Sequence, residues 1–197
     1  DGQEYIDMSI MGIGTNTLGY GQNDVDEAVR KVIDLGNMST LNCPEEVYLA
    51  EKLLELHSWA AMARFARSGG EANAIAIRIA RSFRKKDKIV FCGYHGWFDW
   101  YVAANLRKDD ISKKHVIPGI NPRGVPKSMQ GTAIAFNYND IDSLKKIIFK
   151  NKKEIAAIVM EPIRSVKPRN KFLEKVRYLT KENGITIDFF EITSGFR

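Results

Sequence analysis

The fold is decided by the stretch Gly70-Glu-Ala-Asn-Ala-Ile-Ala-Ile-Arg-Ile-Ala-Arg-Ser-Phe-Arg-Lys-Lys-Asp-Lys-Ile-Val-Phe-Cys92, in which a helical pattern runs directly into a strand pattern. Over residues 70–86, apolar side chains recur at helical spacing. The amphipathic face predicted from them consists of Ala72, Ile75, Ala76, Ile79, Ala80 and Phe83. Residues 88–92 form a short apolar strand that Gly93 closes. A helix that leads into a strand is part of a βαβ unit, so this stretch predicts an α/β fold.

The same alternation continues toward the end of the chain. Strands are predicted at 132–136, 156–160 and 185–190, and helices at 97–106, 141–150 and 172–182. Asp140 is predicted to cap the helix at 141–150. The run at 156–160 is apolar throughout, as expected for a strand buried on both faces. Residues 107–131 are predicted to form a long irregular connection, which usually marks a functional or interface loop. Strands separated by such helices indicate a mostly parallel sheet flanked by helices.

The first part of the chain has a different pattern. Two amphipathic helices are predicted at 24–35 and 45–57, after a glycine-rich segment at 12–21. No apolar strand precedes Gly12-Ile-Gly14, so a turn-rich entry segment is a better interpretation than a dinucleotide-binding loop. We therefore expect two parts, an N-terminal segment with entry helices at 1–60 and a large domain at 61–197.

Composition limits the classes of function. The 197 residues are 44% hydrophobic and 27% charged, and the net charge is +6. The basic residues fall on helix ends and faces without a nucleic-acid module motif, so we expect solvated helix surfaces and an anionic ligand rather than nucleic acid. No apolar run approaches the ~20 residues of a membrane span, and no signal peptide is visible. Cys43 and Cys92 lack metal-site spacing, which predicts reduced thiols, no metal and a cytoplasmic protein.

Ser68-Gly69-Gly70 is the first motif with chemical meaning, because it stands where a loop meets a helix. Two glycines let the backbone approach an anion, and the helix directs free N–H groups and its dipole at it. The alternative is an ordinary serine N-cap.

Two further motifs follow predicted strands. Tyr94 and His95 come after the strand at 88–92, and Glu161 ends the strand at 156–160 just before Pro162. Ligands of open α/β sheets bind outside the carboxyl ends of the strands, which is where these side chains lie. His95 can equally be a hydrogen-bonded structural histidine, and Glu161 can equally be a structural ion-pair partner. Trp97 and Trp100, in the segment after Tyr94 and His95, are predicted to belong to the core.

Three strings carry a family resemblance. They are Arg64-Phe-Ala-Arg-Ser-Gly-Gly-Glu-Ala-Asn-Ala-Ile-Ala-Ile-Arg78, Phe91-Cys-Gly-Tyr-His-Gly-Trp-Phe-Asp-Trp100 and Ile187-Asp-Phe-Phe-Glu-Ile-Thr-Ser-Gly-Phe-Arg197. They resemble, in this order, segments of the class III aminotransferases that use pyridoxal 5′-phosphate (PLP), in the branch of the glutamate-1-semialdehyde 2,1-aminomutases. The resemblance extends over essentially the whole chain.

The resemblance implies a fold-type I large domain, present here in part, and a homodimer that binds PLP. In this family the phosphate lies at the glycine-rich helix start, one aromatic residue stacks on the ring and an aliphatic residue packs on the ring's other side. Tyr94 and Ile192 take these two ring positions. The cofactor-binding residues predicted in this way are Ser68, Gly69, Gly70, Tyr94, His95, Glu161, Asp188 and Ile192.

The last strand departs from the family at one position. In the family an Asp holds the pyridine nitrogen protonated, which makes the ring an electron sink, and Phe190 stands at that position here. Asp188 faces the same side of the strand but lies ~6.6–6.8 Å further back. The Schiff-base lysine of the family lies beyond position 197. We therefore expect no catalytic residue in this chain, and no activity of the chain by itself.

Three functional hypotheses follow. The first is part of an enzyme that moves an amino group between a small amino donor and a carbonyl acceptor through a Schiff base on PLP. The second is a non-catalytic relative that binds PLP, phosphate or a partner subunit, which Phe190 favours. The third, an unrelated nucleotide-binding module, rests only on the glycine-rich segments.

Overall fold

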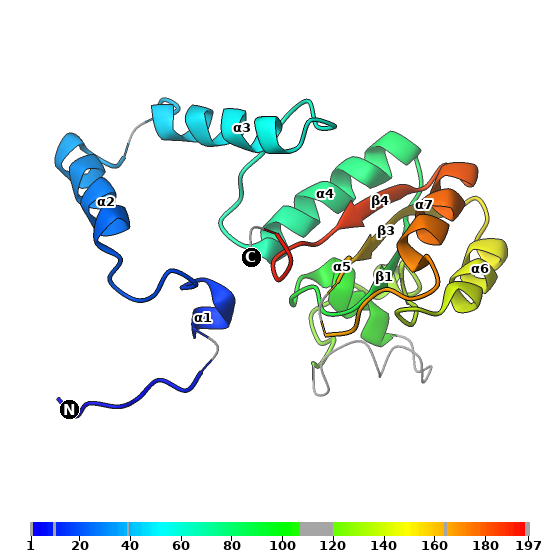
Figure 1. The fold of residues 1–197 in the computed structure, drawn as a ribbon. Helices are drawn as coiled ribbons and strands as arrows, with labels where there is room; N and C mark the ends of the chain where they lie inside the picture. Colours follow the sequence, from blue (N-terminus) through cyan, green and yellow to red (C-terminus); the bar gives the residue numbers. More distant parts are fainter. Residues whose placement is uncertain (1, 10, 39, 107–119, 164, 196–197) are drawn as a thin grey trace. The chain divides into compact units, whose positions relative to one another are not determined.

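The computed structural model describes residues 2–9, 11–38, 40–106, 120–163 and 165–195. The chain separates into two compact units, Asp1–Phe65 with Arg197, and Ala66–Phe196, which are described one at a time (Figure 1). The boundary that the sequence predicts after residue 60 stays a prediction. Of the predicted irregular connection, residues 107–119 lie outside the described part of the chain.

The first unit consists of three helices joined by irregular segments. They are α1 (Met11–Gly14), α2 (Asn23–Leu35) and α3 (Pro44–Leu56), of which the sequence predicted the two longer ones. The Gln22 side chain caps α2 by accepting a hydrogen bond from the Val25 amide at 2.9 Å. Neither α2 nor α3 buries a residue. Both helices therefore form without a core of their own.

The second unit is built on a parallel sheet. Its strands are β1 (Lys88–Cys92), β2 (Ala133–Ala135), β3 (Ile155–Met160) and β4 (Thr186–Phe189), and their order is β2-β1-β3-β4. Every neighbouring pair is parallel, with Phe91 opposite Val159 and Val159 opposite Asp188. All six residues of β3 are buried, as its apolar run predicts. The predicted α/β fold with a parallel sheet is confirmed.

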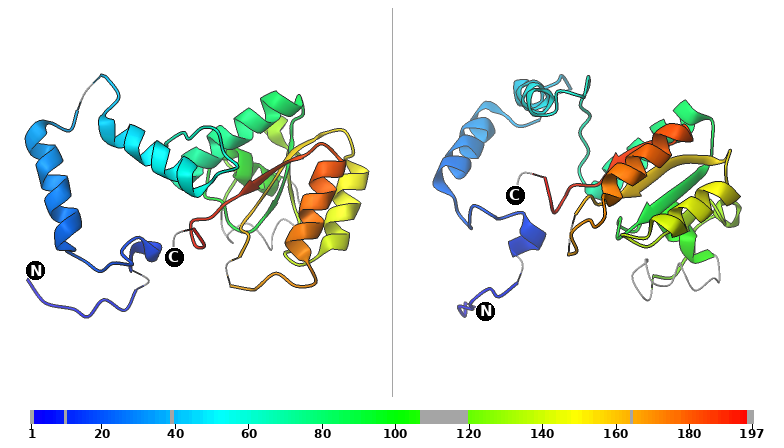
Figure 2. Two further views of the ribbon diagram at one scale, coloured as in Figure 1. Left: turned by 45° about the horizontal axis from the view of Figure 1, so that its top comes forward. Right: turned by 45° about the vertical axis from the view of Figure 1, so that its right-hand side comes forward.

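Helices cover both faces of this sheet (Figure 2). The elements are α4 (Gly69–Arg84), α5 (Asp99–Val102), η1 (Ala103–Leu106), η3 (Lys127–Met129), α6 (Ile141–Lys150) and α7 (Phe172–Glu182). On one face, α4, α5 and η1 pack on a cluster that includes Phe91 and Val159. On the other, α6 and α7 pack on a cluster that includes Val90 and Ile158. Alternate residues of one strand thus face different helices.

The helix boundaries follow from local chemistry. Asp140 caps α6, because its Oδ1 accepts a hydrogen bond from the Ser143 amide at 2.9 Å, as predicted. Gly184 has a φ of +59° just after α7, a conformation that glycine adopts at little cost. Within the described residues, no helix combines the length and the apolar character needed to cross a membrane.

The predicted buried face of α4 is wrong in part. Ile79 and Phe83 were assigned to it, but they are 59% and 73% exposed. The buried residues are Ala80, as predicted, and Asn73 and Ile77, which the prediction left out. Apolar residues occur around much of this helix, so periodicity alone does not select the stripe that meets the sheet.

The corrected face predicts different costs for two identical substitutions in α4. We expect Ile77→Ala to lower the free energy of unfolding by about 2–5 kcal/mol, because it removes a buried side chain and leaves a cavity. We expect Ile79→Ala to change it by about 0.5 kcal/mol or less, because that side chain is exposed. Urea unfolding of the two purified variants measures both values, and equal losses would contradict the assignment.

Candidate functional site

The predicted motifs meet at the carboxyl edge of the parallel sheet. Tyr94 and His95 follow β1, Glu161 follows β3, and Ile192 follows β4. The N-terminus of α4, with Ser68, lies against the same edge, since its glycines contact residues that follow β1 and β4. Four segments that are far apart in sequence thus meet at this edge. We call the group of residues that they bring together the cup: Ser68, Gly69, Gly70, Tyr94, His95, Glu161, Phe190 and Ile192.

The start of α4 is fixed by a pair of reciprocal caps. Ser68 Oγ accepts a hydrogen bond from the Glu71 amide at 3.2 Å, and Glu71 Oε2 accepts one from the Arg67 amide at 2.8 Å. This arrangement is close to the capping box, in which a serine and a glutamate three residues later each satisfy a backbone N–H. The helix then runs for 16 residues and directs its dipole at the cup.

Close packing explains the two glycines at this helix start. A Cβ on Gly70 would stand 2.6 and 2.7 Å from Cε2 and Cδ2 of Phe98. The Gly70 Cα also lies 3.7 Å from the position of a Cβ on Gly96, whose φ is +91°. The loop after β1 therefore closes directly on the first turn of α4, a contact that the sequence did not predict.

His95 is buried beside β1. It is 1% exposed, and its Nε2 lies 2.9 Å from the Cys92 carbonyl oxygen. Its ring stands edge-on to Phe91 at 6.2 Å and to Phe190 at 5.4 Å between centroids. Tyr94 is 37% exposed, so part of this residue remains accessible.

The two tryptophans near these residues differ in burial, although the sequence predicted that both belong to the core. Trp100 is 4% exposed, which confirms its assignment, and Trp97 is 74% exposed, so its assignment is wrong.

Glu161 is held by the turn that follows β4. Its side chain is buried, and its Oε2 accepts a hydrogen bond from Thr193 Oγ1 at 3.0 Å. This bond joins residues 32 positions apart, and nothing in the sequence pattern pointed to Thr193. Burial, together with the charge of Glu161, raises the pKa of the Cys92 thiol to about 12, which keeps that thiol protonated.

The end of β4 places an apolar ring in the cup. The Phe190 amide donates a hydrogen bond to the Met160 carbonyl at 2.9 Å, which continues the ladder beyond the strand. Atoms Cε2 and Cζ of Phe190 lie 3.2 and 3.3 Å from the position of a Cβ on Gly69, and Ile192 Cδ1 lies 3.6 Å from it. Phe190 and Ile192 thus line the cup beside the helix start.

Asp188 lies behind Phe190, on the face of the sheet that α4 covers. It pairs with Val159, which belongs to the cluster under α4. Its Oδ2 is buried without a hydrogen-bond partner among the described residues, and so is Nδ2 of Asn73 in α4. Burial raises the pKa of Asp188 to about 6.

The family follows from the comparison with known proteins. The family model of the class III aminotransferases matches residues 1–197. This chain belongs to that family. It is 35% identical over 203 residues to a glutamate-1-semialdehyde 2,1-aminomutase of Methanococcus maripaludis, and the match covers all of this chain and 46% of that protein.

One more curated relative and one solved structure extend this comparison. A 3-aminobutyryl-CoA aminotransferase of Cloacimonas acidaminovorans is 34% identical over 204 residues, which cover all of the chain and 45% of that protein. A protein of Sphingopyxis sp. MTA144, solved in its PLP internal aldimine form, has the same fold, with a TM-score of 0.80, 23% identity, and coverage of 95% of this chain and 43% of its own. The chain spans about half the length of the curated relatives it matches. The predicted fold-type I architecture is confirmed.

The residues of the cup can be compared with the chemical groups of PLP, the cofactor that the family resemblance implies. The capped start of α4 suits a phosphate in chemistry, because the N-terminus of a helix carries backbone N–H groups without helical partners and the positive end of the helix dipole. The ring of the partly exposed Tyr94 and the side chain of Ile192 suit the two faces of the PLP ring. Phe190 does not suit its ring nitrogen, because a phenyl ring neither accepts a hydrogen bond nor carries charge. The roles predicted for the eight site residues stay predictions.

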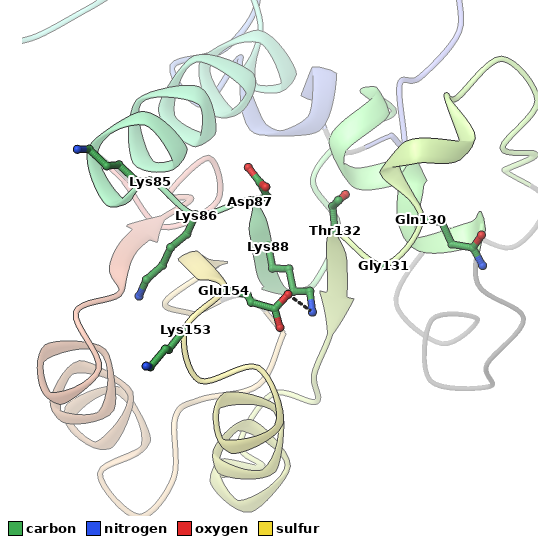
Figure 3. Close-up of a pocket in the computed structure, with 9 residues that line it drawn as sticks. All are labelled: Lys85, Lys86, Asp87, Lys88, Gln130, Gly131, Thr132, Lys153 and Glu154. Atoms are coloured by element: carbon green, nitrogen blue, oxygen red, sulfur yellow. Dashed lines mark ion pairs between the residues drawn. The ribbon is translucent and has the colours of Figure 1, made fainter.

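A second hollow lies at the opposite, amino edge of the sheet. It has a volume of about 450 Å³ and is lined by Lys85, Lys86, Asp87, Lys88, Gln130, Gly131, Thr132, Lys153 and Glu154. Figure 3 shows its central ion pair, in which Lys88 Nζ lies 2.8 Å from Glu154 Oε2, while Lys85 extends away from the pair. None of the predicted site residues lines this hollow.

The close approach at Gly70 predicts a cost for the smallest side chain. We expect Gly70→Ala to lower the free energy of unfolding by about 1–3 kcal/mol, because the added methyl overlaps Phe98. Ser82→Ala, on the exposed side of the same helix, is the matched control and should change it by about 0.5 kcal/mol or less. Urea unfolding compares the two, and a stabilised G70A variant would show that Phe98 does not press on the helix.

The buried carboxyl predicts a pH dependence of stability. The pKa of Asp188 is higher in the folded chain, about 6, than its ordinary value of 3.8, so the folded state binds the proton more tightly. Stability is therefore lost as the pH rises from about 4 to about 6, and the loss persists at neutral pH.

We expect Asp188→Asn to remove this loss and to raise the free energy of unfolding at neutral pH by about 1–3 kcal/mol. Asp142→Asn is the control, because the Asp142 side chain is 76% exposed, and it should keep the wild-type pH dependence. Urea midpoints measured from about pH 4 to about pH 8 decide the matter. A wild-type slope in D188N would mean that another group titrates.

Proposed function

We propose that this chain forms the PLP-binding part of an aminotransferase or aminomutase, which moves an amino group between a small amino compound and a carbonyl compound. The observation that carries the proposal is the cup, where the capped start of α4 meets the ends of β1, β3 and β4 in a member of the class III family. The relatives named above, an aminomutase and an aminotransferase, support both versions of the reaction, so the substrate is left at this level.

Each part of the cup has a task in this proposal. The backbone at Gly69 and Gly70 binds the phosphate, helped by the dipole of α4. Tyr94 and Ile192 hold the ring between them and exclude water from its faces. The hydrogen bond from Thr193 to Glu161 fixes the distance between the ends of β3 and β4. When bound, PLP supplies the carbonyl group that accepts and returns the amino group.

We also propose a cytoplasmic homodimer. One observation supports the dimer: α2 carries an apolar stripe of Val25, Val29 and Ile33, which are 49%, 52% and 55% exposed. A stripe at this spacing is typical of a helix that packs against another surface. A second copy of the chain is the partner that the family resemblance implies. The unpaired thiols of Cys43 and Cys92 are in keeping with a reducing compartment.

The second hypothesis, a non-catalytic relative, has one observation in its favour. Phe190 stands where the family resemblance expects a carboxylate, and the structure shows its ring inside the cup. Family membership and the preserved helix start favour the enzyme.

The test of the proposed function uses the protein from the complete reading frame beside the 197-residue chain. We expect the complete protein to retain PLP, seen as visible absorbance that borohydride abolishes, and to transfer an amino group, seen as a new carbonyl product. The 197-residue chain should bind inorganic phosphate without transferring an amino group. Ser68→Ala should weaken this phosphate binding about 5-fold through loss of the cap, and the control Ser82→Ala should not. A wild-type chain that binds no phosphate would refute the cup.

A further inference from the structure

The part of the cup beside the first turn of α4 is walled by an apolar ring. Phe190 approaches the helix start at Gly69 to 3.2–3.3 Å, measured to the position of a Cβ there. Its ring centroid lies 5.4 Å from that of His95, with an angle of 82° between the ring planes. Ile192 lies on the same wall, 3.6 Å from the same point. Phe190 is thus held between the helix start and a buried histidine, and it occupies a defined place.

The nearest carboxylates do not replace Phe190 at this wall. Asp188 precedes it by two residues on the same face of β4, which places its backbone about 6.6 Å further from the cup. The Asp188 side chain lies under α4 instead, as its pairing with Val159 shows. Glu161 is engaged by Thr193 at the end of β3. Among the described residues, neither of these two carboxylates is therefore placed beside Phe190.

We propose that Phe190 sets the ligand specificity of the cup. The cup accepts phosphate esters that carry a ring, through their phosphate and the faces of the ring. Because of Phe190, it does not favour a ring nitrogen over a ring carbon. This inference rests on the proposed function, because it requires the phosphate to lie at the start of α4. It adds to that function the class of ring that the cup takes.

The physical reason is the cost of an unpaired charge. A protonated pyridine nitrogen that leaves water to lie against a phenyl ring loses its hydrogen bond to water, and the weak attraction of the N–H group to the ring does not replace it in full. A neutral ring of the same shape loses nothing at this wall and gains contact with an apolar surface. The cup therefore binds the neutral ring at least as well as the charged one.

Two probe esters test this without activity. Pyridoxine 5′-phosphate and its analogue with carbon in place of the ring nitrogen have the same phosphate and no aldehyde, so neither reacts with the many lysines. Inorganic phosphate is the third probe. Isothermal titration calorimetry on the 197-residue chain gives the three affinities. We expect the wild-type chain to bind the carbon analogue at least as tightly as the pyridine ester.

The informative variant is Phe190→Asp. A carboxylate at this wall can accept a hydrogen bond from the protonated nitrogen, so the preference should shift toward the pyridine ester by about 10–100-fold. Phe189→Asp is the matched control. Phe189 pairs with Met160, which faces α6 and α7, so a carboxylate there should leave the preference unchanged. Phe190→Leu keeps an apolar wall and should behave as the wild type, which keeps the test valid if F190D does not fold.

The outcomes separate the two proposals. A wild-type chain that prefers the pyridine ester by about 10-fold or more overturns the specificity assigned to Phe190, while the cup itself stands. An equal shift in F189D and F190D also overturns it, because the carboxylate would then act through general charge. Absence of binding for all three probes overturns the proposed function, and the inference with it.

Discussion

The first turn of α4 approaches aromatic rings so closely that the helix start has no room for side chains. Phe98 reaches the Gly70 position to 2.6 Å and Phe190 reaches the Gly69 position to 3.2 Å, each measured to a Cβ that the glycine lacks. This packing brings the backbone N–H groups of the helix start to the carboxyl edge of the sheet. It also joins the loop after β1 to the turn after β4. The shape of the cup depends on this contact more than on any single polar side chain.

The register of the parallel sheet decides which residues of β4 lie on the face that α4 covers. Because Val159 faces α4 and pairs with Asp188, the alternation of the strand directs Phe190 to the same face. Asp188 therefore lies where α4 buries it, and Phe190 lies beside the start of that helix. Burial then raises the pKa of Asp188, while the cup loses a carboxylate. Both effects follow from the identity of two residues on one face of one strand.

Local patterns in the sequence predicted most of this unit. The strands β1 and β3, the helices α6 and α7, and the Asp140 cap follow from runs and spacings within a dozen residues, and the structure has all of them. The failures concern choices that distant residues make. Which stripe of α4 is buried depends on how the helix crosses the sheet, and so Ile79 and Phe83 were misplaced. Trp97 was assigned to the core on its size alone, although aromatic residues in loops are often exposed.

The site divides in the same way. Ser68 and the two glycines could be recognised because capping and anion binding by a helix start are local properties. The contact between Thr193 and Glu161 could not, since it joins two strand ends through the fold. Phe190 is an intermediate case. The sequence identified it as a departure from the family, and only the structure shows what the departure does: the ring does not turn away from the cup but packs on Gly69 and His95.

If Phe190 had no role in this part of the molecule, its side chain would not need to be packed between the start of α4 and His95. A phenyl ring at the end of a strand can turn to solvent at little cost, as the 74% exposed Trp97 does a few residues from the same edge. Phe190 instead lies in contact with the helix start and with a histidine that is 1% exposed. Its position is therefore supported from two sides, and changing it alters the wall that a ligand meets. The structure thus fixes an apolar side chain beside the capped start of α4, at the position where the family resemblance expects a carboxylate.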